Sequence, residues 1–246
     1  MRDATSSDGL HVILKVMDDD TDELAILKHL NEFKSVANHT IKLHGVVHTP
    51  ITKVIALQWG VPLDEYICFH HPPESAALFP EQFLEGVAFL HEHRVAHLDL
   101  KPGNVVVGVD DLDHERKCPP RLFIIDFGVS MFVEDEQTTI VGYCGTQPWV
   151  APEVGSPDGP DLAYSPILAD RWACGQMVKY LEKAVAGGGA GSCGQVSLKD
   201  QLTSSDPGAR PPVKEVLDSY RVSTKGGAKQ IAKAEESDGT QKWAHI

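Results

Sequence analysis

A short polar string at positions 97–104, His-Leu-Asp-Leu-Lys-Pro-Gly-Asn, holds the side chains best suited to chemistry. It contains a carboxylate (Asp99), an amine (Lys101) and an amide (Asn104), and a second carboxylate, Asp126, follows 22 positions after Asn104. Carboxylate and amide oxygens suit Mg²⁺, and a carboxylate can also accept a proton. The plainer alternative is that Asp99 and Asn104 only shape the Pro-Gly turn between them.

Three motifs in order favour the chemical interpretation. The string 97–104 resembles the H-R-D-L-x-x-x-N catalytic loop of protein kinases, Asp126-Phe127-Gly128 resembles the D-F-G triplet, and Ala151-Pro152-Glu153 resembles A-P-E. Chance is a poor explanation of all three at this spacing. The chain is therefore similar to the eukaryotic-type protein kinase family, serine/threonine branch, and the stretch Trp149–Gly155 is similar to a fungal kinase-like group.

The resemblance implies a role for each polar residue. Asp99 would accept the proton of a substrate hydroxyl, Lys101 would contact the transferred phosphate, and Thr146 would hydrogen-bond toward both. Asn104 and Asp126 would hold Mg²⁺. The implied substrates are Mg-ATP and a protein that carries a serine or threonine acceptor.

The resemblance also assigns residues to the nucleotide site. Lys15, in the apolar run 11–17, matches the strand lysine that contacts the ATP phosphates. Glu23 would pair with Lys15, and Leu27, one turn later, would stack in the apolar core of the site. Glu32 is the rival partner, because its spacing from Lys15 is more usual, although its surroundings fit less well.

Adenine would lie against the connection between the two lobes. Leu57 would be the gatekeeper, residues Gln58 to Gly60 would offer backbone groups to the base, and Val106 would belong to the cofactor-binding set.

The elements that must position these residues follow from hydrophobic patterning. Apolar runs predict strands at 11–17, 105–107 and 122–125, and residues 78–93 predict an amphipathic helix with Phe79, Phe83, Val87 and Leu90 inward. The stretch 53–60 resembles the fifth strand of a kinase running into the hinge. The acidic cluster at 18–23 before an apolar periodic run predicts a capped helix N-terminus. The implied fold is α+β and two-lobed, with an N-lobe at 1–60, a helical C-lobe at 61–221 and a disordered tail at 222–246.

Two later matches predict supports for the catalytic loop and the lower lobe. Asp170, which begins the string Asp-Arg-Trp-Ala-Cys-Gly, would brace the backbone of the catalytic loop. Arg210, in a D-P-x-x-R-P match, would pair with Glu153.

Composition excludes several classes of protein. The net charge of −13 and the lack of a basic stripe argue against nucleic acid or an anionic membrane as the main partner. No apolar run is long enough to predict a membrane span or a signal peptide. Five dispersed cysteines suit reduced thiols inside a cell, cytoplasmic or nuclear. His91, His93 and His97 do not match H-E-x-x-H, so we expect no zinc site there.

Four departures from the family bear on activity. No G-x-G-x-x-G precedes Lys15, so we expect the phosphate-covering loop to be missing or truncated, with too few residues for the full first hairpin. Ile13 replaces the small residue above adenine and narrows the pocket. Leu98 replaces the arginine of H-R-D, which binds a phosphorylated loop. The stretch before Arg210 is short, so the substrate-docking helix is reduced.

Three functions follow. The first is a serine/threonine protein kinase, favoured because all catalytic polar groups of the lower lobe are present. The second is a pseudokinase that acts as a binding or scaffold module, supported by the departures above. The third and weakest is a small-molecule kinase, against which the intact segment from Thr146 to Ala151-Pro152-Glu153 speaks. The oligomeric state is not predicted.

Overall fold

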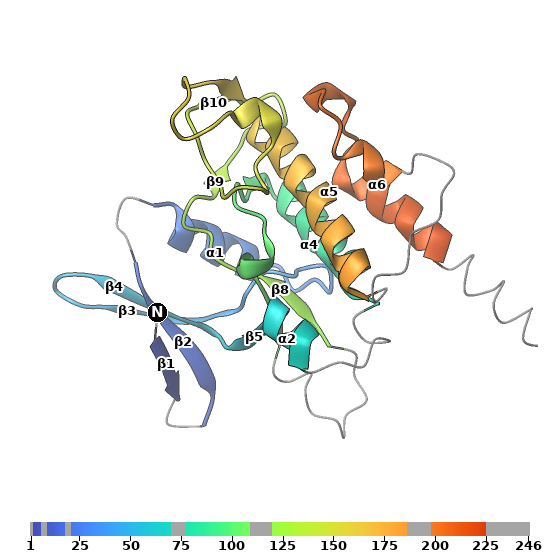
Figure 1. Cartoon of the computed structure of the whole chain (residues 1–246). Coiled ribbons are helices and arrows are strands. Elements are labelled where there is room, and N and C mark those ends of the chain that lie inside the picture. Colours follow the sequence, from blue (N-terminus) through green and yellow to red (C-terminus); the bar gives the residue numbers. More distant parts are fainter. Residues whose placement is uncertain are drawn as a thin grey trace, which may run out of the picture.

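The computed structural model describes residues 2–5, 9–17, 21–69, 77–108, 120–185 and 198–224. A sheet-rich N-terminal part lies beside a helical C-terminal part (Figure 1), which confirms the predicted α+β, two-lobed fold. The strands are β1 (Arg2–Thr5), β2 (His11–Val16), β3 (Leu43–His48), β4 (Lys53–Gln58), β5 (Gly60–Pro62), β6 (Val95–Ala96), β7 (Val105–Gly108), β8 (Leu122–Ile124), β9 (Met131–Phe132), β10 (Ile140–Val141) and β11 (Ala163–Tyr164). The helices are α1 (Glu23–Asn31), α2 (Leu63–Phe69), α4 (Phe79–Glu92), α5 (Pro166–Val185), α6 (Leu198–Gln201) and a last helix over residues 213–224, with 3₁₀ turns at Pro102–Asn104, Pro152–Val154 and Pro207–Ala209.

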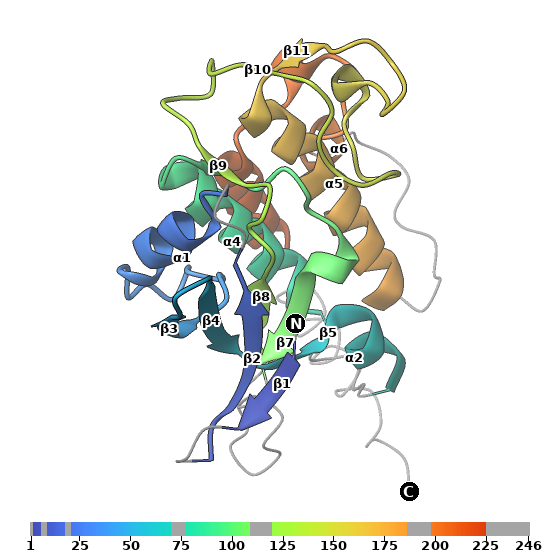
Figure 2. The same cartoon turned by 90° about the vertical axis from the view of Figure 1, so that its left-hand side faces the viewer.

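The N-terminal sheet has the strand order β1-β2-β4-β3, and all its pairs are antiparallel. Figure 2 shows β1 and β2 as neighbours at the open end of this sheet. The strand β1 was not predicted, and it pairs residues 2–5 with residues 11–14 of β2. Among the described residues one strand, β1, precedes the strand that carries Lys15, so the pair β1–β2 is not the full first hairpin for which we expected too few residues.

Helix α1 packs on the N-terminal part through an apolar stripe. Ile26, Leu27 and Leu30 are fully buried, as the period of an amphipathic helix requires. Each such side chain contributes about 1.5–3 kcal/mol when it leaves water. The predicted acidic cap is wrong at Asp22: this residue has φ −77° and ψ 1° rather than extended backbone, and its side chain accepts no cap hydrogen bond.

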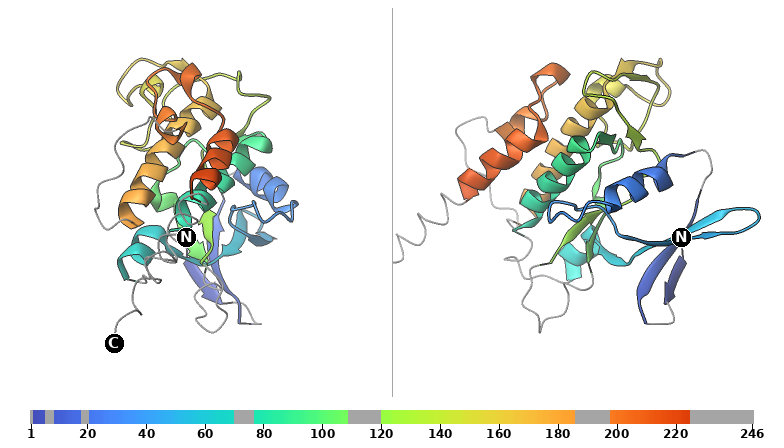
Figure 3. Two further views of the ribbon diagram at one scale, coloured as in Figure 1. Left: turned by 90° about the vertical axis from the view of Figure 1, so that its right-hand side faces the viewer. Right: turned by 180° about the vertical axis from the view of Figure 1, so that it is seen from behind.

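The C-terminal part is built on α4 and α5. These two helices and the last helix run side by side in Figures 1 and 3. The predicted inward face of α4 is confirmed, since Phe79, Phe83, Val87 and Leu90 are all fully buried. The helix thereby supports β6 and the loop that follows it.

A single apolar core runs across both parts, from Ile26 on α1 to Leu217 in the last helix. Ile41 donates its N–H to the carbonyl oxygen of Ile124 at 3.0 Å, and Thr40 bridges to Ile124, so the segment after α1 is tied to β8. The predicted lobe boundary after residue 60 falls inside β5, whose partner is β7 of the lower part.

Several predictions lie outside the described residues, in whole or in part. These are the charged insert at 110–121 apart from its last two residues, the glycine run 187–191, Cys118, Cys193, and the tail beyond residue 224. Residues 222–224 of the predicted tail belong to the last helix. Among the helices that the structure describes, none is long and apolar enough to cross a membrane.

Candidate active site

Lys15 joins three elements at the inner edge of the N-terminal sheet. Its Nζ lies 2.6 Å from Oε1 of Glu23 on α1 and 2.7 Å from Oδ1 of Asp126, which follows β8. The predicted Lys15–Glu23 pair is thus confirmed. The rival Glu32 is exposed at the other end of α1, where it forms the C-cap.

The charged forms of Lys15 and Asp126 are favoured where these two side chains meet. Burial disfavours the ammonium of Lys15, but its hydrogen bonds to Asp126 and Glu23 outweigh that effect, so the pKa of Lys15 is raised. Burial likewise disfavours the carboxylate of Asp126, yet the hydrogen bond from Lys15 holds the pKa of Asp126 below its ordinary value. Gly128 leaves room here, because a Cβ at this position would lie 3.4 Å from Oδ1 of Asp126.

The catalytic-loop candidates form a second polar cluster. Nζ of Lys101 lies 2.7 Å from Oδ2 of Asp99 and 2.7 Å from Oγ1 of Thr146. Nδ2 of Asn104 donates to the backbone oxygen of Asp99 at 2.8 Å and to its Oδ2 at 2.9 Å. Thr146 therefore meets Lys101 as predicted, while its predicted hydrogen bond to Asp99 is not among those formed.

One carboxylate oxygen of Asp99 is left without a partner. Its Oδ2 accepts from Lys101 and Asn104, whereas Oδ1 is buried and receives no hydrogen bond within the described structure. The hydrogen bonds that orient this carboxylate therefore all go to Oδ2.

Asp170 on α5 holds the catalytic loop in place, as predicted. Its carboxylate accepts the backbone N–H of His97 at 2.6 Å and that of Leu98 at 2.8 Å. Leu98 has φ +65°, a left-handed conformation that is uncommon for residues other than glycine and that needs support from its surroundings. The two hydrogen bonds supply that support and fix the position of the backbone that leads into Asp99.

His97 connects this loop to the segment that carries Asp126, a role that the motif did not reveal. Its Nε2 contacts the carbonyl oxygen of Ile125 at 3.0 Å, and its Nδ1 accepts the N–H of Asp99 at 3.2 Å. Complete burial lowers the pKa of His97, which favours the neutral ring with its proton on Nε2. The ring also packs against Phe127, with 5.0 Å between centroids.

The residues predicted to contact adenine lie together between the two parts. Leu57 and Val106 are buried, and Ile13 pairs with Leu57 across β2 and β4. Gly60 must be small, since a Cβ there would come within 2.8 Å of Cγ2 of Val106. The N–H of Gln58 is donated to the carbonyl oxygen of Lys42 at 2.9 Å, and the contact of Gln58 to Gly60 with a base stays a prediction.

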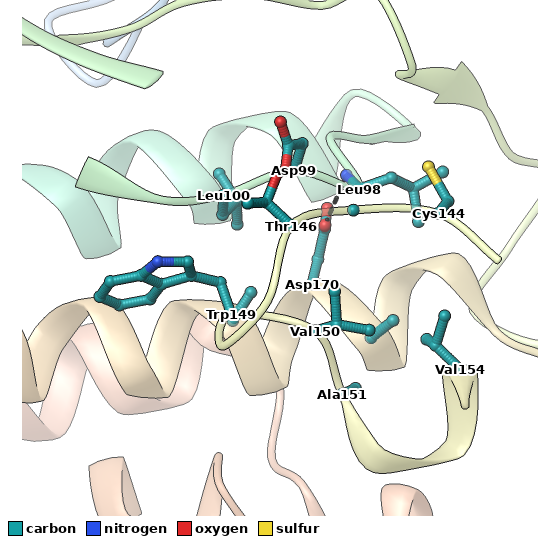
Figure 4. Close-up of a pocket in the computed structure, with 13 residues that line it drawn as sticks. Leu98, Asp99, Leu100, Cys144, Thr146, Trp149, Val150, Ala151, Val154 and Asp170 are labelled. Atoms are coloured by element: carbon teal, nitrogen blue, oxygen red, sulfur yellow. Dashed lines mark hydrogen bonds between the residues drawn. The ribbon is translucent and has the colours of Figure 1, made fainter. Parts of the chain in front are cut away.

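Thr146 belongs to a segment anchored at both ends. Figure 4 shows the small cavity of about 20 Å³ where Leu98, Asp99 and Cys144 meet Thr146 and Val150. Beyond it, the predicted Arg210–Glu153 pair is formed with two hydrogen bonds of 2.5 and 2.8 Å.

The donor set fits Mg-ATP. The pair Asn104 and Asp126 offers an amide oxygen and a carboxylate, and Mg²⁺ is usually held by one or two protein oxygens together with substrate phosphates. No group of three His, Cys, Asp or Glu side chains suited to a metal occurs in the described ranges. His91, His93 and His97 each contact an acceptor of their own, namely Asp170, the Phe89 carbonyl and the Ile125 carbonyl.

Comparison with curated proteins finds fungal relatives. The chain is 35% identical over 113 residues to "Serine/threonine-protein kinase ppk24, mitochondrial" of Schizosaccharomyces pombe, covering 44% of this chain and 22% of that protein. It is 38% identical over 109 residues to "Serine/threonine-protein kinase HAL5" of Saccharomyces cerevisiae and 39% identical to HAL5 of Candida glabrata, covering 43% of this chain in each case. The matched region spans only 11% and 12% of those two proteins.

A family model gives the broader match. Residues 8–186 match the model described as "Protein kinase domain". This range contains Lys15, Glu23, Asp99, Asn104 and Asp126, which the structure brings into two adjoining clusters. Since the match covers more than half of the sequence, the chain belongs to the protein kinase domain family.

Proposed function

We propose that the chain is a serine/threonine protein kinase that transfers the γ-phosphate of Mg-ATP to hydroxyl groups of proteins. The observation that carries this proposal is the Asp99 carboxylate, which Lys101 and Asn104 orient through Oδ2 while Lys101 also contacts Thr146. A scaffold module has no need of a carboxylate oriented in this way. An enzyme that deprotonates a hydroxyl needs one.

Each residue has a defined part in this mechanism. Asp99 accepts the proton of the acceptor hydroxyl on its carboxylate. Lys101, held between Asp99 and Thr146, places a positive charge beside the acceptor, where the transferred group carries negative charge. Asn104 fixes the rotamer of Asp99 by donating to both its backbone and side-chain oxygens.

The other cluster holds the nucleotide. Mg-ATP, when bound, supplies the phosphoryl group and the cation that neutralises its charge. Asn104 and Asp126 would hold the magnesium ion, and Lys15, kept in place by Glu23, would contact phosphate oxygens. Leu57 and Val106 would contact the base from the buried strands β4 and β7.

Serine and threonine acceptors are proposed for two reasons. Thr146 alone does not select an acceptor, but its contact with Lys101 matches the arrangement expected of serine/threonine kinases. The motif segment from Thr146 to Glu153 is also intact. The relatives named above carry serine/threonine kinase in their names.

A pseudokinase is the second candidate, and specific observations favour it. Ile13 stands beside Leu57 on the neighbouring strand, and the N–H of Gln58 is donated to the carbonyl oxygen of Lys42. These features weaken nucleotide binding. They do not explain why Lys101 and Asn104 orient the Asp99 carboxylate.

Transfer of radiolabelled phosphate to a generic basic protein tests the proposal. Asp99→Asn keeps the size of the side chain and removes the proton acceptor, so incorporation should fall by about 10²–10⁴-fold with an unchanged melting temperature. The matched control is Asp158→Asn, an exposed residue in the loop before β11, which should leave the rate unchanged. Equal incorporation by wild type and Asp99→Asn, or none by either, would reject the kinase function.

A further inference from the structure

A groove of about 290 Å³ runs along α5 next to the candidate active site. It is lined by Pro148, Trp149, Gln176, Lys179, Tyr180 and Lys183. Four of these residues come from α5, where positions 176, 179, 180 and 183 lie on one face because they are three or four residues apart. The other two come from the segment that follows Thr146.

The groove and the cavity lined by Asp99 and Thr146 share one residue. Trp149 lines both. In Figure 4 its indole extends over α5, away from Asp99. The residues next to an acceptor bound at Asp99 would reach the groove by passing Trp149.

The groove contains two lysines that form no ion pair in the described part of the chain. Lys183 is exposed. Nζ of Lys179 donates to Oγ1 of Thr203 at 2.7 Å, and this neutral partner leaves the charge of Lys179 in place.

Two aromatic side chains that contact each other form another wall of the groove. Trp149 and Tyr180 meet edge to face with 5.9 Å between centroids. The hydroxyl of Tyr180 donates to Oδ1 of Asp64 on α2, so one carboxylate borders this wall and no ion pair joins it to Lys179 or Lys183 in the described structure.

We propose that this groove selects protein substrates that carry an anionic side chain, carboxylate or phosphate, within a few residues of the acceptor. The inference rests on the proposed function and adds the substrate class. Two cations beside a rigid aromatic wall are complementary to an acidic peptide and repel a basic one. On a chain with a net charge of −13, an acidic substrate needs such a local positive site to approach.

Binding is measured without relying on catalysis. Fluorescein-labelled peptides with alanine in place of the acceptor, carrying glutamate, phosphoserine or lysine at each of three positions on either side, are titrated with the full chain by fluorescence anisotropy. We expect anionic peptides to bind about fivefold or more tightly than the lysine peptides at one or two positions. The phosphoserine and glutamate arms show which anion is preferred.

The variant Lys183→Glu should abolish or reverse this preference, and Lys179→Glu should reduce it. The matched control Lys34→Glu makes the same charge change at an exposed lysine after α1 and should leave the preference intact. Preference that survives in both groove variants, equal binding of anionic and basic peptides by wild type, or no binding of any peptide would overturn the inference.

Phosphorylation of the matching serine peptides separates the inference from the proposed function. A specificity role predicts that Lys183→Glu raises KM for acidic peptides while kcat stays unchanged. If no peptide is phosphorylated but the anionic peptides still bind in a Lys183-dependent manner, the kinase function fails and the groove assignment stands.

Discussion

Replacing Glu153 with alanine leaves the guanidinium of Arg210 buried without its carboxylate. The Arg210 side chain has no exposed surface, and its two nitrogens lie 2.5 and 2.8 Å from the oxygens of Glu153. Removing one partner of a buried ion pair typically destabilises a protein by about 3–5 kcal/mol, because the remaining charge stays desolvated.

The lower end of that range applies here. Arg210 keeps hydrogen bonds to the carbonyl oxygens of Leu168 at 2.7 Å and Ser204 at 2.9 Å, and its guanidinium lies 5.2 Å from the centroid of Trp172. We therefore expect Glu153→Ala to lower the free energy of unfolding by about 3 kcal/mol. Since a domain of this size loses about 2–4 °C per kcal/mol, the melting temperature should fall by about 6–12 °C.

Urea unfolding followed by circular dichroism measures this change, with thermal unfolding alongside. The control Lys214→Ala removes an exposed pair with Asp218, whose side chains are 50% and 58% exposed, and should cost less than about 0.5 kcal/mol. The double variant Glu153→Leu with Arg210→Met removes both charges and should be more stable than Glu153→Ala. A loss in Glu153→Ala no larger than in the control, or a double variant that is worse than the single one, would refute this reasoning.

Three further outcomes are expected. Hydrogen bonds from His39 and Arg221 hold the pKa of Glu85 at about 2, so wild type should be more stable than Glu85→Gln at pH 7, and urea titrations should show this advantage vanishing as the pH falls from about 4.5 to 2. Ile13→Ala should strengthen the thermal stabilisation by Mg-ATP, which we expect to be weak in wild type; a submicromolar wild-type Kd would contradict this. Phosphatase treatment should not change the activity of wild type or of the double variant Thr138→Ala, Thr139→Ala. A large loss of activity on dephosphorylation, seen only in wild type, would show that a cationic side chain binds a phosphate on this segment.

The catalytic loop could be predicted because its chemistry restricts the residue types. Asp99, Lys101 and Asn104 occur at a spacing that few other sequences share, and Asp170 and Glu23 were each located by a neighbouring string. The structure brings Asp170 to the backbone of the catalytic loop, Glu23 to Lys15 and Lys101 to Thr146, as expected. Their catalytic roles stay predictions.

Contacts that depend on partners far along the chain were predicted less well. Residues 2–5, Arg-Asp-Ala-Thr, have no strand pattern of their own and become β1 only through pairing with β2. The N–H of Gln58 is donated to Lys42 because the segment before β3 lies beside the end of β4, which no local pattern reveals. Asp22 has the residue type of a cap but the wrong backbone angles for one.

The segment after Asp126 is held by a charged contact as well as by apolar ones. Of Met131, Phe132 and Val133, only Val133 is buried, while Phe132 is 40% exposed. The carboxylate of Glu136 pairs with the buried guanidinium of Arg171 on α5, a contact between distant positions that no local pattern predicts. The unphosphorylated segment therefore already has a carboxylate paired with a cation of the lower lobe. A phosphate is not needed to supply that negative charge, so we expect activity that is independent of phosphorylation.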